Sequence, residues 1–151
     1  MWNPRFGTGK NSIFVVFILI AFTNSQLGKA QTNVYGGPLE VCSTDPMTGY
    51  FRNGYCETEE GDYGSHTVCA EVSKEWLEHQ KSMGNDLMTS RYGFQGLKPG
   101  DHWCLCASRW KQGLAYGNPT KVKMNATNFL ALHTLNMQEL ESNACDANND
   151  L

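Results

Sequence analysis

The chain has 151 residues, and its 12 lysines and arginines against 15 aspartates and glutamates give a net charge of −3 at pH 7. The first 32 residues hold Arg5, Lys10 and Lys29 and no acid, so the remainder has nine basic and 15 acidic groups and a net charge of −6. An acidic domain lacks the basic surface that nucleic acid or an anionic membrane face requires, so we expect neither as a partner once the leader is removed.

The N-terminus has the pattern of a targeting leader. A basic, acid-free opening precedes ten apolar residues, Ile13 to Phe22. A membrane-spanning helix needs roughly 20 such residues, so the run has the length of a signal-peptide core. We predict a leader over residues 1–30, cleaved after Ala30 or Ala21, and a protein of the secretory pathway, either secreted or in an organelle lumen. A single-pass anchor is the alternative if the leader stays uncleaved. A cut after Ala21 would resemble the leaders of algae with complex plastids.

A single domain is expected over residues 33–144, followed by a polar tail over residues 145–151. The stretch "VYGGPLEVCS" predicts a short strand. Asp45 and Pro46 indicate a turn, which Gly49 allows the chain to leave. Asn53-Gly54 is a typical hairpin signal between two arms that carry aromatic residues. The stretch "SHTVCAEV" alternates well enough to predict another strand.

Two helices have recognisable boundaries. Ser73 is a good N-cap for a helix through about Met83, closed by Gly84. The apolar side chains of this helix, including Met83, are expected to meet a sheet. Near the C-terminus, Asn136 and Glu139 have the spacing of a capping box.

Further elements follow the turn expected at Pro99-Gly100, where glycine accepts a positive φ. The stretch "DHWCLCA" predicts a strand, "SRWKQGLAYG" a short helix that ends at Gly117, and "TKVKMNAT" another strand. The mixture of strands and helices predicts an α+β fold: a two-layer sandwich with helices on one face of a small mixed or antiparallel sheet.

The most informative stretch is the strand that contains two cysteines. Side chains alternate along a strand, so Cys104 and Cys106 are predicted to share one face with His102, while Trp103 and Leu105 point to the other. We therefore expect this strand to be buried on both sides. The Cα atoms of the two cysteines would lie roughly 6.5 Å apart, near the upper limit for a disulfide, so they are not expected to bridge each other.

Several roles remain open for the cysteines. They can pack as small hydrophobes, or form structural disulfides in which the strand cysteines pair with Cys42, Cys56 or Cys69. Zinc prefers four thiolate or imidazole ligands, and one candidate set is Cys42, Cys69, Cys104 and Cys106. The Cys-x-Cys spacing differs from the zinc-ribbon spacing. Zinc is the only cofactor that the sequence suggests.

A reactive thiol is the remaining role, because a neighbouring cation stabilises a thiolate. Cys104 or Cys106 would be the nucleophile, with His66, Asp45 or Arg109 as candidate helpers. The sequence alone leaves open whether the protein is an enzyme. Separately, Asn125, Ala126 and Thr127 form an N-glycosylation sequon, which would be used only in the secretory pathway.

Three long motifs carry a family resemblance: "LEVCSTDPMTGYFRNGYCET", "GSHTVCAEVSKEWLEHQKSMGNDL" and "YGFQGLKPGDHWCLCASRW". They resemble the largely bacterial domain-of-unknown-function family 2237, over about Asn33 to Ala144. The resemblance implies a small two-layer α/β sandwich and no established activity. The positions that match its pattern are Cys42, Asp45, Pro46, Gly49, Cys56, His66, Cys69, Gly84, Asn85, Asp86, Pro99, Gly100, Asp101, Trp103, Cys104, Cys106, Arg109 and Trp110.

The resemblance also bears on the thiols. Most relatives have no leader, so the five cysteines of the pattern imply a thiol or metal site in the ancestral domain. Cys145 lies outside the pattern, and we expect oxidation in this chain to recruit some of the thiols, with Cys145 as a candidate partner. The function predicted from the sequence is a binding or structural module with a cysteine-rich core. A thiol-dependent redox protein or a zinc-binding protein is the alternative.

Overall fold

The computed structural model describes residues 30–145, so nearly all of the expected leader and of the polar tail lie outside it. Three antiparallel strands form a sheet in the order β2-β1-β3, with β1 over Val68–Glu71, β2 over His102–Leu105 and β3 over Lys121–Val122. The helices are α1 (Lys74–Ser82), α2 (Ala107–Ala115) and α3 (Met137–Glu141), with two 3₁₀ turns, η1 (Met124–Ala126) and η2 (Phe129–His133). This arrangement confirms the predicted α+β class.

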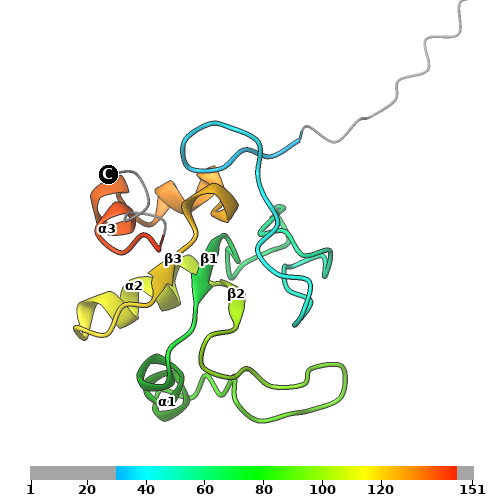
Figure 1. Ribbon diagram of the computed structural model, residues 1–151, viewed down its shortest axis with the longest axis vertical. Helices are drawn as coiled ribbons and strands as arrows, with labels where there is room; N and C mark the ends of the chain where they lie inside the picture. The colour runs from blue at the N-terminus through cyan, green and yellow to red at the C-terminus, as the bar shows by residue number, and fades with distance from the viewer. Residues whose placement is uncertain (1–29, 146–151) are drawn as a thin grey trace, which may run out of the picture.

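The sheet is buried on both faces, as the alternation along β1 and β2 predicts. Val68 pairs with Leu105 and Ala70 pairs with Trp103, and these four residues belong to the main hydrophobic core with residues of α1 and α2. On the opposite face, Cys69 pairs with Cys104 in a second, cysteine-rich cluster. The N-terminal segment, blue to cyan in Figure 1, lies on the side of β1 away from α1 and α2.

Helix α1 follows its sequence signals closely. The Ser73 side chain accepts a hydrogen bond from the Trp76 amide at 3.1 Å, and Gly84 takes a φ of +80° after the last turn. Trp76 and Leu77 are fully buried, as expected for the face that meets the core. Met83 is 42% exposed, so the expectation that it joins this face is wrong; the helix ends at Ser82, and Met83 is its C-cap residue.

Other elements of the C-terminal half also match their signals. The capping box of Asn136 and Glu139 is present at the start of α3. The amide of Asp101 donates to the carbonyl of Lys98 across the turn, and Gly100 has a φ of +92°. Helix α2 ends before Gly117 as predicted. The third strand is shorter than expected, because the chain turns into η1 directly after Lys123.

Two predicted elements of the N-terminal half do not form. Residues 34–43 form no strand and make a single isolated bridge, from Pro38 back to Thr32, because Gly36 has a φ of +80° and the chain turns back on itself there. No hairpin forms at Asn53 and Gly54. The Asn53 side chain accepts a hydrogen bond from the Tyr55 amide at 3.1 Å and so caps the local turn, a contact that competes with strand pairing.

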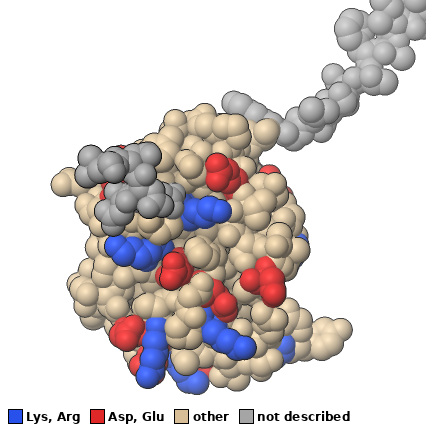
Figure 2. Space-filling view, in the orientation of Figure 1, with Lys and Arg blue, Asp and Glu red and all other residues tan. Residues whose placement is uncertain are grey.

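The face of the molecule drawn in Figure 2 carries mixed charge. On the face drawn in Figure 2, basic and acidic side chains lie interspersed, with no extended patch of one sign. No helix within residues 30–145 is long and apolar enough to cross a membrane.

Candidate functional site: a thiol, an imidazole and a carboxylate

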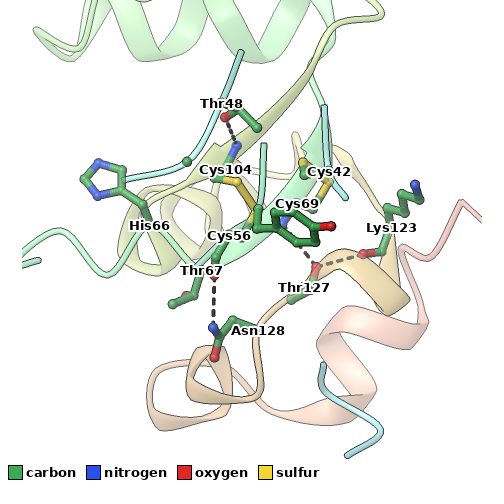
Figure 3. Close-up of a disulfide and its surroundings, with 12 residues drawn as sticks. Cys42, Thr48, Cys56, His66, Thr67, Cys69, Cys104, Lys123, Thr127 and Asn128 are labelled. Atoms are coloured by element: carbon green, nitrogen blue, oxygen red, sulfur yellow. Dashed lines mark hydrogen bonds between the residues drawn. A yellow bond between two sulfur atoms is a disulfide. The ribbon is translucent and has the colours of Figure 1, made fainter. Parts of the chain in front are cut away.

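Two disulfides fasten the N-terminal loops to the sheet. Cys42 is bonded to Cys69 of β1, and Cys56 is bonded to Cys104 of β2 (Figure 3). Since Cys69 and Cys104 are opposite each other in the ladder, the two bridges lie side by side. The expectation that the two strand cysteines pair with Cys42, Cys56 or Cys69 is confirmed for Cys104 and wrong for Cys106, which is in no disulfide. Cys145 does not take part, and its thiol donates to the carbonyl of Val122 at 3.1 Å.

The disulfides also bear on the zinc hypothesis. The sulfur atoms of Cys42, Cys56 and Cys104 lie within 4.8 Å of one another. Each belongs to a disulfide, which leaves it no thiolate to give to a metal ion. Of the four cysteines expected as zinc ligands, Cys106 alone keeps its thiol, and the set would require the reduced chain.

Cys106 does not lie in the strand, contrary to the prediction. Strand β2 ends at Leu105, and Cys106 is the N-cap of α2, with its carbonyl accepting from the amides of Arg109 and Trp110. Its side chain makes no capping hydrogen bond. The thiol is partly exposed and lies at the positive end of a nine-residue helix, where the aligned peptide dipoles stabilise an anion.

The register of the sheet brings His66 to this thiol. Val68 pairs with Leu105, so the residues just before β1 lie beside those just after β2. The amide of Ala107 donates to the carbonyl of Ser65 at 3.0 Å and joins the two segments. Figure 3 shows the His66 ring directed away from the two disulfides. The thiol of Cys106 is its neighbour instead: a Cβ built at Gly64 would lie 2.6 Å from His66 Cε1 and 3.1 Å from Cys106 Sγ.

A buried carboxylate holds the imidazole from its other side. Asp62 Oδ1 lies 2.6 Å from His66 Nδ1, and Asp62 Oδ2 accepts from the His66 amide at 2.8 Å. The side chain of Asp62 is 1% exposed. Because Nδ1 is occupied by Asp62, Nε2 is the ring nitrogen that remains for the thiol of Cys106. The three side chains therefore form one cluster, in which the imidazole is bonded to the carboxylate and has the thiol as a neighbour.

The pKa values of His66 and Asp62 agree with this cluster. The hydrogen bond with Cys106 raises the pKa of His66 to about 9; desolvation opposes the shift, and the bond to Asp62 adds to it. Burial alone would raise the pKa of Asp62. The hydrogen bonds that Asp62 accepts from His66 and Thr58 outweigh this effect and lower its pKa. At neutral pH the imidazole is therefore protonated, between a carboxylate and a sulfur atom.

The loop that carries Asp62 and His66 is fixed from several sides. Thr58 donates its hydroxyl to Asp62 at 2.9 Å, and Thr58 is held in turn by two hydrogen bonds with the Gln31 side chain. Ser65, just before His66, has a φ of +49°, which is uncommon for a residue with a side chain. Gly64 packs so closely that a Cβ there would lie 2.6 Å from His66 Cε1 and 3.1 Å from Cys106 Sγ.

The thiol and imidazole face hollows in the surface. A small one of about 60 Å³ is lined by Cys106, His66 and Arg109, among others. A larger one of about 370 Å³ also borders His66 and Trp103. A ligand that occupies the larger hollow would therefore lie next to the imidazole, and the smaller hollow gives access to the sulfur.

The sequence-predicted candidates are placed very differently. His66, Cys106 and Arg109 come together. Cys104 is buried in a disulfide, so it offers no thiol, and the exposed Asp45 lines neither of these hollows. Sequence reasoning missed Asp62. Its only sequence signal is the four-residue spacing to His66, which carries meaning only in this loop conformation.

The sequon lies beside the cysteine cluster, to which Ala126 belongs. Asn125 is half-buried in η1. The hydroxyl of Thr127 is buried, accepts from the Cys69 amide at 3.1 Å and donates to the Lys123 carbonyl at 3.0 Å. An oligosaccharide would therefore have to be attached before the chain folds, and glycosylation of Asn125 stays a prediction.

A model of a protein family described as "uncharacterized protein conserved in bacteria" (DUF2237) matches residues 32–144. The chain belongs to the DUF2237 family. The resemblance inferred from the three long motifs is thereby confirmed, over nearly the whole described part of the chain. No curated protein matches it. Membership of the DUF2237 family does not indicate an activity, and the function is therefore inferred from the side chains of the site.

Proposed function

We propose that the protein is a thiol-dependent enzyme in which Cys106 is the nucleophile. His66 is the acid–base partner of the thiol, and Asp62 positions the His66 ring. The observation that carries the proposal is the cluster of Asp62, His66 and Cys106, placed at a helix N-terminus and open to a hollow. A nucleophile, a neighbouring base and a third group that orients the base are the usual components of covalent catalysis by a side chain.

The reaction class that fits these groups best is acyl transfer. Cys106 Sγ forms a bond with the acyl carbon, and the thiol proton is held by His66 Nε2. His66 then gives this proton to the leaving group as the carbon–heteroatom bond breaks. Water attacks the resulting thioester, returns a proton to the sulfur and releases the acid. Water is the only co-reactant, whereas a redox cycle at Cys106 would need an external oxidant and reductant.

The cysteine-rich core is the scaffold for this site. Cys104, two residues before the nucleophile, is held in a buried disulfide. The expectation of a cysteine-rich core thus agrees with the two disulfides, and a binding or structural role remains the alternative if Cys106 proves unreactive.

We also propose that the protein works in an oxidising compartment, outside the cytosol. Two disulfides in a domain of this size are typical of such compartments. The apolar run of the N-terminus supplies a route to the secretory pathway, either for secretion or for an organelle lumen. A tagged chain expressed in eukaryotic cells, followed by N-terminal sequencing of the recovered protein, tests both the cleavage and the destination.

An activated ester tests the enzymatic proposal. With p-nitrophenyl acetate, we expect a burst of nitrophenolate equal to the enzyme concentration, and an acetyl group on Cys106 in the peptide map. Cys106→Ala should abolish the burst and His66→Gln should slow it, while Cys145→Ala should leave it unchanged. Acetylation that survives in Cys106→Ala, or no burst in the folded wild-type protein, would contradict the proposal.

A further inference from the structure

The hollows beside the thiol have an unusual composition for an acidic protein. The larger hollow, of about 370 Å³, is lined by the aromatic rings of Tyr50, Phe94 and Trp103 and by the guanidinium groups of Arg52 and Arg91. The smaller one, next to Cys106, contains Arg109. A third, of about 300 Å³, adjoins them through Arg52, Phe94 and Trp103. No aspartate or glutamate lines any of the three.

Arginine is concentrated at this place. Residues 30–145 contain three arginines, Arg52, Arg91 and Arg109, and all three line these hollows. No lysine in the same range does so. Arginine is the side chain that recognises carboxylate and phosphate in a bidentate manner, whereas lysine acts as a point charge. The distribution therefore differs from the mixed charge of the outer surface in Figure 2.

The guanidinium groups are held in place but keep most of their donors unused. The Arg52 guanidinium lies 4.9 Å from the centre of the Trp103 ring, and that of Arg91 lies 5.3 Å from the centre of the Phe94 ring. Arg52 donates to the Gly49 carbonyl at 3.3 Å and Arg91 to the Asp86 carbonyl at 2.6 Å. These are neutral acceptors, and a guanidinium has five N–H donors.

No ion pair within the described part of the chain involves any of the three arginines. Arg52 also has a φ of +54°, one of two non-glycine residues with a positive φ in that part; the other is Ser65, next to His66. Uncommon backbone conformations of this kind gather at functional sites, where the surrounding structure maintains them. The three guanidinium groups thus line the hollows without an acidic partner, and those of Arg52 and Arg91 are held by contacts with a ring and a carbonyl.

We propose that the substrate of this site is a small organic anion, with a carboxylate or phosphate group that Arg52, Arg91 and Arg109 bind. Its flat apolar body lies against Trp103 and Phe94, and its electrophilic carbon reaches Cys106. The inference rests on the proposed thiol chemistry. The hollow of about 370 Å³ is at the small end of the usual range for ligand pockets, which favours a small molecule over a polymer.

The charge preference can be measured without knowing the substrate. Iodoacetate and iodoacetamide alkylate a thiol by the same step, in which an S–C bond forms and iodide leaves, but only iodoacetate is an anion. We expect the iodoacetate-to-iodoacetamide rate ratio to be about tenfold higher at Cys106 than at Cys145 of the same molecule in low salt. The preference should decrease as salt screens the arginines.

Matched charge variants identify the groups responsible. Arg52→Gln/Arg91→Gln and Arg109→Gln should each lower the ratio at Cys106. Lys121→Gln removes an exposed cation on β3 and should leave the ratio unchanged. If iodoacetamide labels Cys106 no faster than Cys145, the proposed thiol site is wrong. If iodoacetamide labels Cys106 rapidly but iodoacetate gains no preference, the anion inference is wrong and the thiol site stands.

Protection experiments separate the two kinds of anion. Benzoate and phenyl phosphate are added while iodoacetamide labels Cys106, with neutral benzamide as the control. We expect one of the anions to slow the labelling at a concentration where benzamide has no effect, and the anion that does so identifies the group. The protection should be lost in Arg52→Gln/Arg91→Gln. Equal protection by benzamide, or none by either anion, would contradict the inference.

Discussion

At the scale of single residues, the contact between His66 and Cys106 decides the chemistry. Each side chain has a second anchor: His66 Nδ1 is 2.6 Å from buried Asp62, and Cys106 begins α2. A free thiol in a surface loop would have neither a fixed direction nor a stabilising charge. Here the imidazole is oriented before any substrate arrives, which is the condition for efficient proton transfer.

The raised pKa of His66 gives a pH prediction. Between pH 6.5 and about 9 the folded protein holds a proton that the unfolded chain has released. The stabilising contribution of His66 is therefore complete below pH 6.5 and is lost as the pH rises through about 9. NMR titration of the His66 ring should give a midpoint near 9, and Cys106→Ala, which removes the largest cause of the shift, should lower that midpoint towards 6.5.

Cys145→Ala is the control for this titration and should leave the midpoint unchanged. A midpoint of His66 near 6.5 in the wild-type protein would show that the imidazole and the thiol do not interact in solution.

At the scale of elements, the site lies at one end of the β1–β2 pair, where the chain enters β1 and leaves β2. β1 and β2 supply the register, the loop over residues 58–67 carries Asp62 and His66, and α2 begins at the nucleophile. Gly64 allows the loop to approach the thiol. The φ of Gly64 is not among the positive values, so an alanine there would not strain the backbone. Its side chain would instead clash with neighbouring atoms.

Gly64→Ala is therefore expected to push the imidazole and the thiol apart. The new Cβ would lie 2.6 Å from His66 Cε1, closer than atoms of this kind pack. Overpacking of this kind costs about 1–3 kcal/mol of unfolding free energy, and the pKa of His66 should fall as its hydrogen bond with Cys106 weakens. Gly61→Ala in the same loop, with its nearest contact at 3.3 Å, is the matched control. A His66 pKa that is unchanged in Gly64→Ala would refute this packing.

The elements with strong local signals were predictable, and those held by distant contacts were not. Ser73, Gly84 and the capping box of Asn136 specify helix boundaries within a few residues of the chain. The strand predicted over Cys106 ends one residue earlier because α2 begins there, and alternation alone does not mark that boundary. Asp62 could not be assigned a role, since its contact with His66 depends on a loop that Thr58 and Gln31 hold.

At the scale of the whole molecule, the disulfides replace secondary structure in the N-terminal half. Residues 32–60 form no strand of the sheet, yet they cover one of its faces. The bridges close loops with sequence separations of 27 and 48 residues. Each is worth about 3–4 kcal/mol by the chain-entropy estimate, an appreciable share of the stability of a domain of this size.

Cys42→Ser/Cys69→Ser is expected to lower the free energy of unfolding by about 3–4 kcal/mol and the Tm by roughly 10–15 °C. Thermal and denaturant unfolding followed by circular dichroism measure the change, with Cys145→Ala as the control that removes a cysteine but no bridge. Thiol counting of the denatured wild-type protein should give two thiols before reduction and six after it. Six thiols before reduction would refute both bridges.

The most direct test of the thiol site compares two cysteines in one molecule. The folded wild-type protein is treated with a limiting amount of iodoacetamide at pH 7, and peptide mass spectrometry follows the labelling of Cys106 and Cys145 over time. The account predicts that Cys106 is labelled about tenfold faster or more, and that His66→Gln removes most of this advantage. Equal labelling of the two thiols, or a rate at Cys106 that does not depend on His66, would contradict it.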